Sequence, residues 1–595
     1  MAVKVSAAKQ SLVKGHQYRL LLVFCGSVVL FAALVLVVGC AVPAASLPYT
    51  ISGTVADAGR PVAGAIVKMQ GTSNQMTTGK DGAFLLHGEG LGGSKVATVT
   101  AWAEGHFIGW VTLDPQKPIW KAGGAGVTIS LRPLYASDNN QYTWNTSASC
   151  GMCHREYKEW QTDAHSQSAT DPHFVTMYQG TNVRGQSGQP TQLLNNFTAL
   201  PPDPSKPYYG PGYRLDYPLI SGNCSTCHTP MASHSAIDDN CAWAGCHTSA
   251  TADQSAALGQ GDIRGVTPVG LEGVGTEGVG CDFCHKVGSV ILDPKTHLPF
   301  PDSPGILSVK LYRPSAGEQL FFGPMTDVSR QPASYLPLET QSEFCAPCHY
   351  GVFGGVVGDM EVTGGTVIYN SYGEWLKSPY SAAETGKSCQ DCHMPAPNTN
   401  FSAFLDKGGI PRDHTALHSH TMRGIADQSL MSNAVTMKSN AAHNGGTLLV
   451  QVSVTNDKTG HDVPTDQPMR SVMLVVEALG ADGKRLSLSQ GLTLPSWTGN
   501  YAGQPGRVFA EVLKDNWTGE TPTVAIWRPV TVVADTRLAP FATDATAYSF
   551  NLPAGAAATV RVKLVYRLAF QQLEQQKGWN DPDIIMAEAT IPVEK

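Results

Sequence analysis

Apolar and polar residues alternate at short range near the start of the 595-residue chain. Stretches rich in β-branched and aromatic residues recur there between turns such as Gly59-Arg60-Pro61 and Lys80-Asp81-Gly82. Short strands separated by frequent turn signals are typical of a β-sandwich, which we predict over residues 48–134. The predicted strands are 49–55, 65–69, 83–86, 95–103 and 126–131.

The same alternation returns in the last part of the chain and predicts a second β-sandwich over residues 437–595. The run "TLLVQVSVT" at 447–455 alternates at period two. The other predicted strands are 471–478, 523–533 (interrupted by Pro529), 547–552 and 559–567.

Residues 145–430 show no extended stretch with the two-residue period of a strand or the 3.6-residue period of a helix. The chain contains 61 Gly and 39 Pro, which predict many turns and few long helices. The expected fold is therefore multidomain, with a β-sandwich, an irregular mainly α/loop region, and a C-terminal β-sandwich.

The amino terminus, residues 1–40, has the pattern of an export signal. Basic residues precede an uncharged apolar run from Leu20 to Val38, which ends in Gly39-Cys40. As a helix this run would span roughly 29 Å, about the thickness of a bilayer core. The ending resembles a bacterial lipobox, in which Cys40 would carry lipid; an uncleaved membrane anchor and an ordinary cleaved signal are the alternatives. We expect an exported protein, membrane-anchored in the first two cases, with its body in the periplasm or at the cell surface.

Twelve of the 14 cysteines form six close pairs, and a histidine directly follows every pair. Five sites read C-x-x-C-H and the third reads C-x-x-x-x-C-H. The sites are Cys150/Cys153/His154, Cys224/Cys227/His228, Cys241/Cys246/His247, Cys281/Cys284/His285, Cys345/Cys348/His349 and Cys389/Cys392/His393. This pattern is the attachment signal for haem c, in which both thiols bond to the porphyrin and the histidine ligates the iron.

Zinc and disulfides are the alternative explanations of the cysteine pairs. Zinc motifs usually place their histidines several residues from a cysteine pair, and disulfides leave the histidines unexplained. We therefore predict six haem c groups with six irons. About 280 residues are too few to build an ordinary core around each, so the haems themselves must form much of the core.

An iron that only carries electrons usually needs a second axial ligand. The chain after residue 155 offers nine further histidines for this role. We expect ligands among His165, His173, His234, His297, His418, His420 and His461, with His414 and His443 as weaker candidates. Met231, Met394 or Met422 could replace one histidine.

Several longer stretches carry a family resemblance. "EGVGCDFCHKV", "SEFCAPCH", "HSHTMRG" and "TGHDVPTDQPMR" resemble the large exported multihaem cytochromes c related to the hydroxylamine-oxidoreductase-like group. The resemblance implies closely spaced, mostly bis-histidine haems, with His165, His420 and His461 as distal ligands. Asp163, where many relatives have serine, and the long spacer between Cys241 and Cys246 depart from the pattern. The run "ISGTVADAGRPVAGAIVKMQ" resembles the carboxypeptidase-regulatory-like domain, which implies a spacer or docking module without catalysis.

The amino-acid composition limits the classes of function that this chain can have. Charged residues make up only 15% and the net charge is −7, which argues against nucleic-acid binding. We expect electron transfer between a membrane donor and a periplasmic or extracellular acceptor, with redox proteins as partners. One alternative is a multihaem oxidoreductase acting on a small nitrogen or sulfur compound, which would need an iron with an open position. Another is a homo-oligomeric cytochrome filament.

Overall fold

The amino-terminal sheets enclose a core of alternating buried side chains. The computed structural model describes residues 50–93, 96–117, 125–194, 199–218, 222–232, 271–301, 303–354, 356–358, 361–363, 365–382 and 386–594. One four-stranded sheet contains β1 (Thr50–Asp57), β2 (Arg60–Pro61), β5 (Ala83–His87) and β8 (Ala125–Leu131). The other has the order β4 (Gln75–Thr77), β3 (Ile66–Met69), β6 (Ala97–Trp102) and β7 (Gly109–Leu113).

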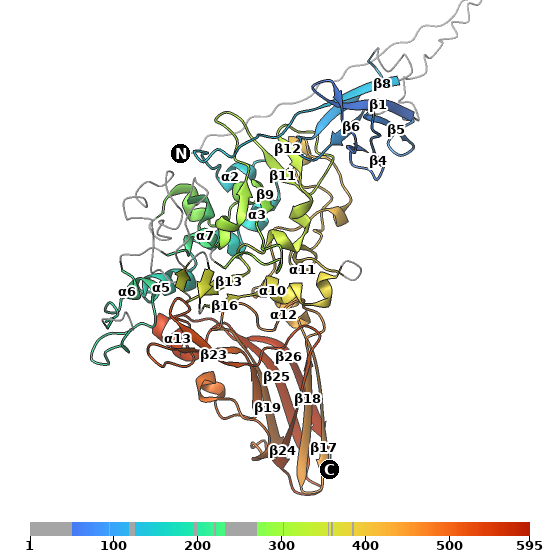
Figure 1. The fold of residues 1–595 in the computed structure, drawn as a ribbon. Coiled ribbons are helices and arrows are strands. Elements are labelled where there is room, and N and C mark those ends of the chain that lie inside the picture. Colours follow the sequence, from blue (N-terminus) through green and yellow to red (C-terminus); the bar gives the residue numbers. More distant parts are fainter. Residues whose placement is uncertain are drawn as a thin grey trace, which may run out of the picture. The chain divides into compact units, whose positions relative to one another are not determined.

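All five predicted strands of this region are present, because residues such as Ile51, Val67 and Phe84 alternate toward one shared core. Sequence reasoning missed β2, β4 and β7. The first two are too short for a period to show, and β4 contains no fully buried residue. β8 joins β1 in parallel, so the last strand of the region packs beside the first (Figure 1).

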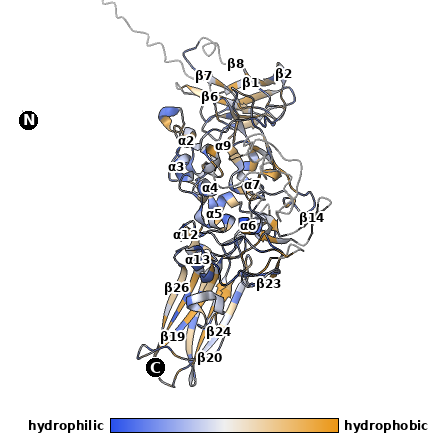
Figure 2. Cartoon of the chain, turned by 90° about the vertical axis from the view of Figure 1, so that its left-hand side faces the viewer, coloured by the Kyte–Doolittle hydropathy of each residue, from blue (hydrophilic) through white to orange (hydrophobic). Residues whose placement is uncertain are grey.

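The carboxy-terminal sheets form the second sandwich, and Figure 2 shows apolar residues along their strands. One sheet has the order β17 (Thr436–Asn444), β18 (Thr447–Thr455), β24 (Thr543–Asn551) and β20 (Leu488–Gln490). The other has the order β21 (Gly506–Phe509), β19 (Ser471–Gly480), β25 (Ala558–Arg567) and β26 (Ile584–Val593). Val450, Leu474 and Val562 belong to the common core.

The prediction of a strand over 523–533 was wrong in its first half. Only β23 (Val530–Asp535) forms, paired with β22 (Glu511–Asp515). The preceding residues turn instead, so that the Arg528 guanidinium reaches two buried carboxylates, those of Asp216 and Asp515. A buried cation requires such partners, and this requirement outweighs the local preference for strand.

Short helices and two-stranded sheets make up the described residues between the sandwiches (Figure 1). The helices are α2 (Ser147–Cys150), α3 (Glu156–Trp160), α4 (Ala164–Gln167), α5 (Pro172–Gln179), α6 (Tyr213–Asp216), α7 (Ser225–His228), α9 (Cys281–Cys284), α10 (Ser371–Leu376), α11 (Cys389–His393) and α12 (Gln428–Asn433); α13 (Gln571–Lys577) follows later. The paired strands are β9 (Val287–Val290) with β10 (Val309–Leu311), β11 (Phe321–Gly323) with β12 (Ala333–Tyr335), β13 (Gly351–Phe353) with β16 (Thr366–Tyr369), and β14 (Val356–Gly358) with β15 (Glu361–Thr363). The helices are short, as expected; α2, α7, α9 and α11 lie at four of the cysteine motifs, whereas the Cys345 motif is a turn preceded by the 3-10 helix Ser342–Phe344.

Buried polar contacts hold the amino-terminal sandwich on the central region, and Ser46–Lys595 form one compact unit. The carboxylate of Asp327, which is fully buried, accepts the Gly71 backbone N–H at 2.9 Å and the Arg412 guanidinium at 2.7 Å. Gln70 donates its side-chain amide to the Asp327 carbonyl at 2.7 Å. The sandwich is therefore anchored at one loop by a satisfied buried carboxylate.

Two sets of predictions lie outside the described residues. They are the leader at 1–40, and His234 with the third motif, Cys241, Cys246 and His247. Within the described ranges, no helix is both long and apolar enough to cross a bilayer.

Candidate haem-binding site

A continuous cavity of about 1820 Å³ lies in the central region. All ten cysteines and all five histidines of the described motifs line it. Protein interiors normally contain few voids larger than a water molecule, and ordinary ligand pockets measure roughly 300–1,000 Å³. A mostly apolar space of this size inside a folded chain therefore requires large apolar groups to fill it. The ten cysteines are free thiols, as covalent attachment of haem requires.

Three motif histidines each face a second histidine across this cavity. The ring centres lie 6.2 Å apart for His349 and His165, 6.3 Å for His285 and His420, and 6.3 Å for His393 and His461. Metals bind histidine nitrogen at roughly 2 Å, so one iron held between two imidazoles sets their ring centres roughly 6 Å apart. The three separations match that span.

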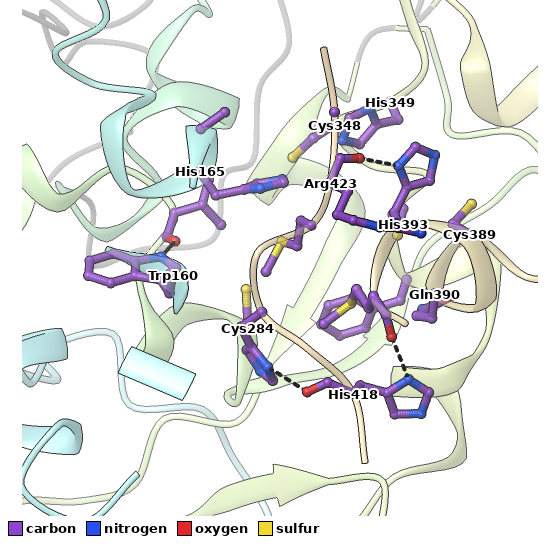
Figure 3. Close-up of a pocket in the computed structure, with 18 of the residues that line it drawn as sticks. Trp160, His165, Cys284, Cys348, His349, Cys389, Gln390, His393, His418 and Arg423 are labelled. Atoms are coloured by element: carbon purple, nitrogen blue, oxygen red, sulfur yellow. Dashed lines mark hydrogen bonds between the residues drawn. The ribbon is translucent and has the colours of Figure 1, made fainter. Parts of the chain in front are cut away.

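Most of these imidazoles are anchored through Nδ1. Among the motif histidines, Nδ1 of His285 lies 2.8 Å from the Phe322 carbonyl and that of His393 lies 2.6 Å from the Arg423 carbonyl (Figure 3). A nitrogen next to a carbonyl oxygen must donate, which leaves the lone pair on Nε2. An acceptor on the other nitrogen is the usual support of a metal-bound histidine, because it fixes both the tautomer and the ring orientation.

The facing histidines are held in the same manner. Nδ1 of His165 donates to the Asp163 carboxylate at 2.7 Å, and Nδ1 of His461 lies 2.9 Å from the Asp462 carbonyl. Asp163 also accepts the His165 backbone N–H and so caps α4. Trp160 packs inside with its indole N–H on the Val279 carbonyl at 2.8 Å. Figure 3 shows His165 pointing into the cavity from the side of Trp160.

Burial keeps two of the rings neutral. It lowers the pKa of His420 to about 3 and that of His393 to about 4. A neutral imidazole is the form that binds a metal. For His285, burial acts to lower the pKa, but the Glu339 carboxylate, 3.2 Å from Nδ1, raises it overall to about 9. A carboxylate at that nitrogen strengthens the ring as an electron donor once Nε2 is bound.

Asp466 is a site residue that sequence reasoning missed. Its carboxylate accepts the backbone N–H groups of Asn370 and Ser371, both at 3.0 Å, and lies 3.8 Å from Nδ1 of His349. Burial alone would raise the pKa of Asp466, but His349 lowers it overall. Asp466 therefore connects the His461 loop to the segment that follows His349. In the sequence, only its closeness to His461 could have indicated that Asp466 belongs to the site.

Thiols from different motifs touch one another. The Cys281 thiol lies close to that of Cys150, the Cys348 thiol to that of Cys227, and the Cys345 thiol to that of Cys389. The Cys345 motif therefore contacts two other motifs. Groups attached at these cysteines would form two sets of neighbours, one at the Cys150 and Cys281 motifs and one at the Cys224, Cys345 and Cys389 motifs.

The remaining predicted ligands occupy other positions. His173 uses both ring nitrogens, on Asp171 at 2.9 Å and on Asp581 at 2.8 Å, so neither nitrogen is left for an iron. His297 is exposed and is not part of the cavity wall. His418 lines the cavity, with Nδ1 3.2 Å from the Met394 carbonyl.

Two motif histidines have different surroundings. In the described residues, neither His154 nor His228 has a histidine at the paired separation. Nδ1 of His228 donates to the Ser168 carbonyl at 2.8 Å, and Phe174 stacks on its ring with centres 3.6 Å apart. This contact fixes the plane of the His228 imidazole. His414 and His443, the weaker candidates, are not part of the cavity wall.

Comparison with known proteins gave few similarities. No family model matches the chain, so its resemblance to the carboxypeptidase-regulatory-like domain stays a prediction. No curated protein matches either. Among solved structures, a penta-haem cytochrome c552 from Thermochromatium tepidum is 19% identical with a TM-score of 0.49, covering 76% of this chain and 100% of that one. A PapD-like domain of human CEP192 is 8% identical with a TM-score of 0.12, covering 28% of this chain and 86% of that one.

Proposed function

We propose that this chain is an exported multihaem cytochrome c that carries electrons between a membrane donor and a periplasmic or extracellular acceptor. The observation that carries the proposal is the set of three histidine pairs, each pairing a motif histidine with a second imidazole across one apolar cavity. Bound haem would supply reversible one-electron chemistry at low potential under bis-histidine ligation.

The chain's own residues perform three tasks in this proposal. The cysteine pairs would hold the porphyrins covalently. The paired histidines would ligate the irons, and the carboxylates of Asp163, Asp466 and Glu339 orient these histidines or strengthen them as donors. The apolar wall excludes water, which keeps the reorganisation energy of electron transfer small.

The thiol contacts support close spacing within two groups of sites. The Cys150 motif adjoins the Cys281 motif, and the Cys345 motif adjoins those of Cys224 and Cys389. Each second ligand also comes from a segment remote from the motif it faces; His165, for example, follows the first motif but faces His349. The third motif, Cys241/Cys246/His247, is proposed as a sixth attachment site on its sequence alone.

The proposal is tested by removing one second ligand at a time from the matured full-length protein. His165→Ala, His420→Ala and His461→Ala should each convert one haem from low spin to high spin, as measured by electron paramagnetic resonance of the oxidised protein. His414→Ala is the matched control, because His414 is exposed and lies outside the cavity wall, and its spectrum should equal that of wild type.

Intact mass of the wild-type protein gives the number of haems, with six expected. A colourless matured protein, or three variants whose spin states equal wild type, would contradict the proposal. Wild-type protein that already contains a high-spin iron able to bind carbon monoxide would favour the oxidoreductase alternative.

A further inference from the structure

The first haem-attachment motif lies at the surface beside a second segment of chain. Ala403 and His154 form an antiparallel bridge, and the Phe404 backbone N–H donates to the Cys153 carbonyl at 2.8 Å. Met152 and Leu405 are the next residues on the two segments, so both lie beside this contact.

Both neighbours are apolar and open to solvent. Met152 is 68% exposed and Leu405 is 50% exposed. Met152 also lies between the two cysteines that would hold the porphyrin. Solvent-exposed apolar side chains beside a cofactor-attachment motif are typical of the centre of a small protein interface.

Cationic side chains flank this pair. Lys407, 51% exposed, follows Leu405 by two residues. Arg330 is exposed and donates to the Lys407 carbonyl. Asp406, paired with Lys407 at 3.6 Å, is the one acidic group on the same turn.

This local charge contrasts with the rest of the molecule. The whole chain has a net charge of −7, and haem propionates would add more negative charge. A cationic rim around an apolar centre on an otherwise acidic protein orients an acidic partner during encounter. Interfaces for electron transfer are small, below roughly 1,200 Å², so two apolar residues and a few charges are sufficient to define one.

We propose that Met152 and Leu405, with Arg330 and Lys407, form the port at which an acidic electron-transfer protein docks on the Cys150–His154 site. This inference rests on the proposed function. The partner would present acidic side chains around its own cofactor edge. Electrons would cross between that edge and the first attached group, which gives the relay a defined entry or exit.

The experiment measures stopped-flow electron transfer between the full-length holoprotein and two probe proteins. The acidic probe is a reduced plant-type two-iron ferredoxin, and the basic probe is oxidised mitochondrial cytochrome c. For the variant Lys407→Glu, we expect the rate with ferredoxin at low salt to fall by roughly three- to tenfold and the rate with cytochrome c to rise. Added salt should remove both differences.

Met152→Gln and Leu405→Gln test the apolar centre and should slow ferredoxin by a similar factor at every salt concentration. Lys484→Glu is the control, because Lys484 is an exposed lysine of the carboxy-terminal sandwich with the same kind of acidic neighbour. Haem content and spin state are measured for every variant, so that only correctly loaded protein is compared.

Two failures are distinguishable. A wild-type protein without haem gives no transfer to either probe and ends the proposed function. A loaded wild-type protein whose ferredoxin rate is unchanged in Lys407→Glu, Met152→Gln and Leu405→Gln overturns the docking site alone, as does an equal loss in Lys484→Glu.

Discussion

Glu511, at the start of β22, is held in an acidic cluster that should make the protein less stable as pH rises. One guanidinium, that of Arg537, lies 2.9 Å from Glu374, 3.6 Å from Glu511, 3.6 Å from Asp462 and 2.8 Å from Asp535. One oxygen of Glu511 is buried without a hydrogen-bond partner. Burial is the largest cause that raises the pKa of Glu511 from 4.5 to about 7, with neighbouring carboxylates adding to it and Arg537 opposing it.

The pH dependence of stability follows from the difference between the pKa of Glu511 in the folded and in the unfolded chain. Below pH 4.5 the carboxyl is protonated in both folded and unfolded chains and contributes nothing. Between pH 4.5 and 7 only the unfolded chain loses the proton, so folding stability falls as pH rises. Above pH 7 the full cost is present, about 3 kcal/mol for this pKa difference.

Glu511→Gln removes this titration while keeping the shape of the side chain. We expect the variant to be more stable than wild type by up to about 3 kcal/mol at pH 8 and nearly equal to it at pH 4. Urea denaturation followed by circular dichroism measures both. The control is Glu588→Gln on β26, an exposed glutamate whose replacement should change stability by less than about 0.5 kcal/mol at either pH. A Glu511→Gln protein that is less stable than wild type at pH 8 would show that the carboxylate is a needed partner of Arg537, and the reasoning would be refuted.

Two further variants test contacts of single carboxylates. Asp327→Ala leaves the partly buried Arg412 without its partner and frees the Gly71 loop, so we expect a loss of roughly 3 kcal/mol and early release of the amino-terminal sandwich in limited proteolysis; an unchanged digestion pattern would show that the anchor lies elsewhere. Asp163→Ala removes both the cap of α4 and the acceptor for His165, so one haem should show a high-spin fraction that increases on warming, whereas a spectrum equal to wild type at all temperatures would remove Asp163 from the supports of that ligand.

The sequence predicted the sandwiches better than the region between them. Residues 447–455 were expected as a strand and form β18 with the same bounds, because strict alternation toward a core leaves one solution. β26 was missed, although it pairs along β25, since Glu588 and Pro592 interrupt its apolar pattern. Patterns of this kind depend on a protein core, which both sandwiches have.

The central region has no comparable signal. The cysteine motifs predicted residues of the cavity wall, and the family resemblance predicted His165, His420 and His461 as ligands. Neither predicted which motif each of these histidines faces. That pairing depends on contacts remote in sequence, such as His349 with Asp466. His173 is a counter-example. Histidine is a suitable iron ligand by residue type, but two carboxylates accept hydrogen bonds from both nitrogens of this ring. Where prosthetic groups take the place of side chains in the core, the spacing of apolar residues does not predict the secondary structure.

The crossed origin of the facing histidines has a consequence for how the protein matures. Because His165 belongs to the segment of the first motif but faces His349, this pocket closes only when stretches made early and late in synthesis are both in place. A molecule that misses a single attachment would leave neighbouring pockets open and its backbone accessible to proteases. Molecules with incomplete haem attachment would thus be degraded and would not accumulate as partially active electron carriers.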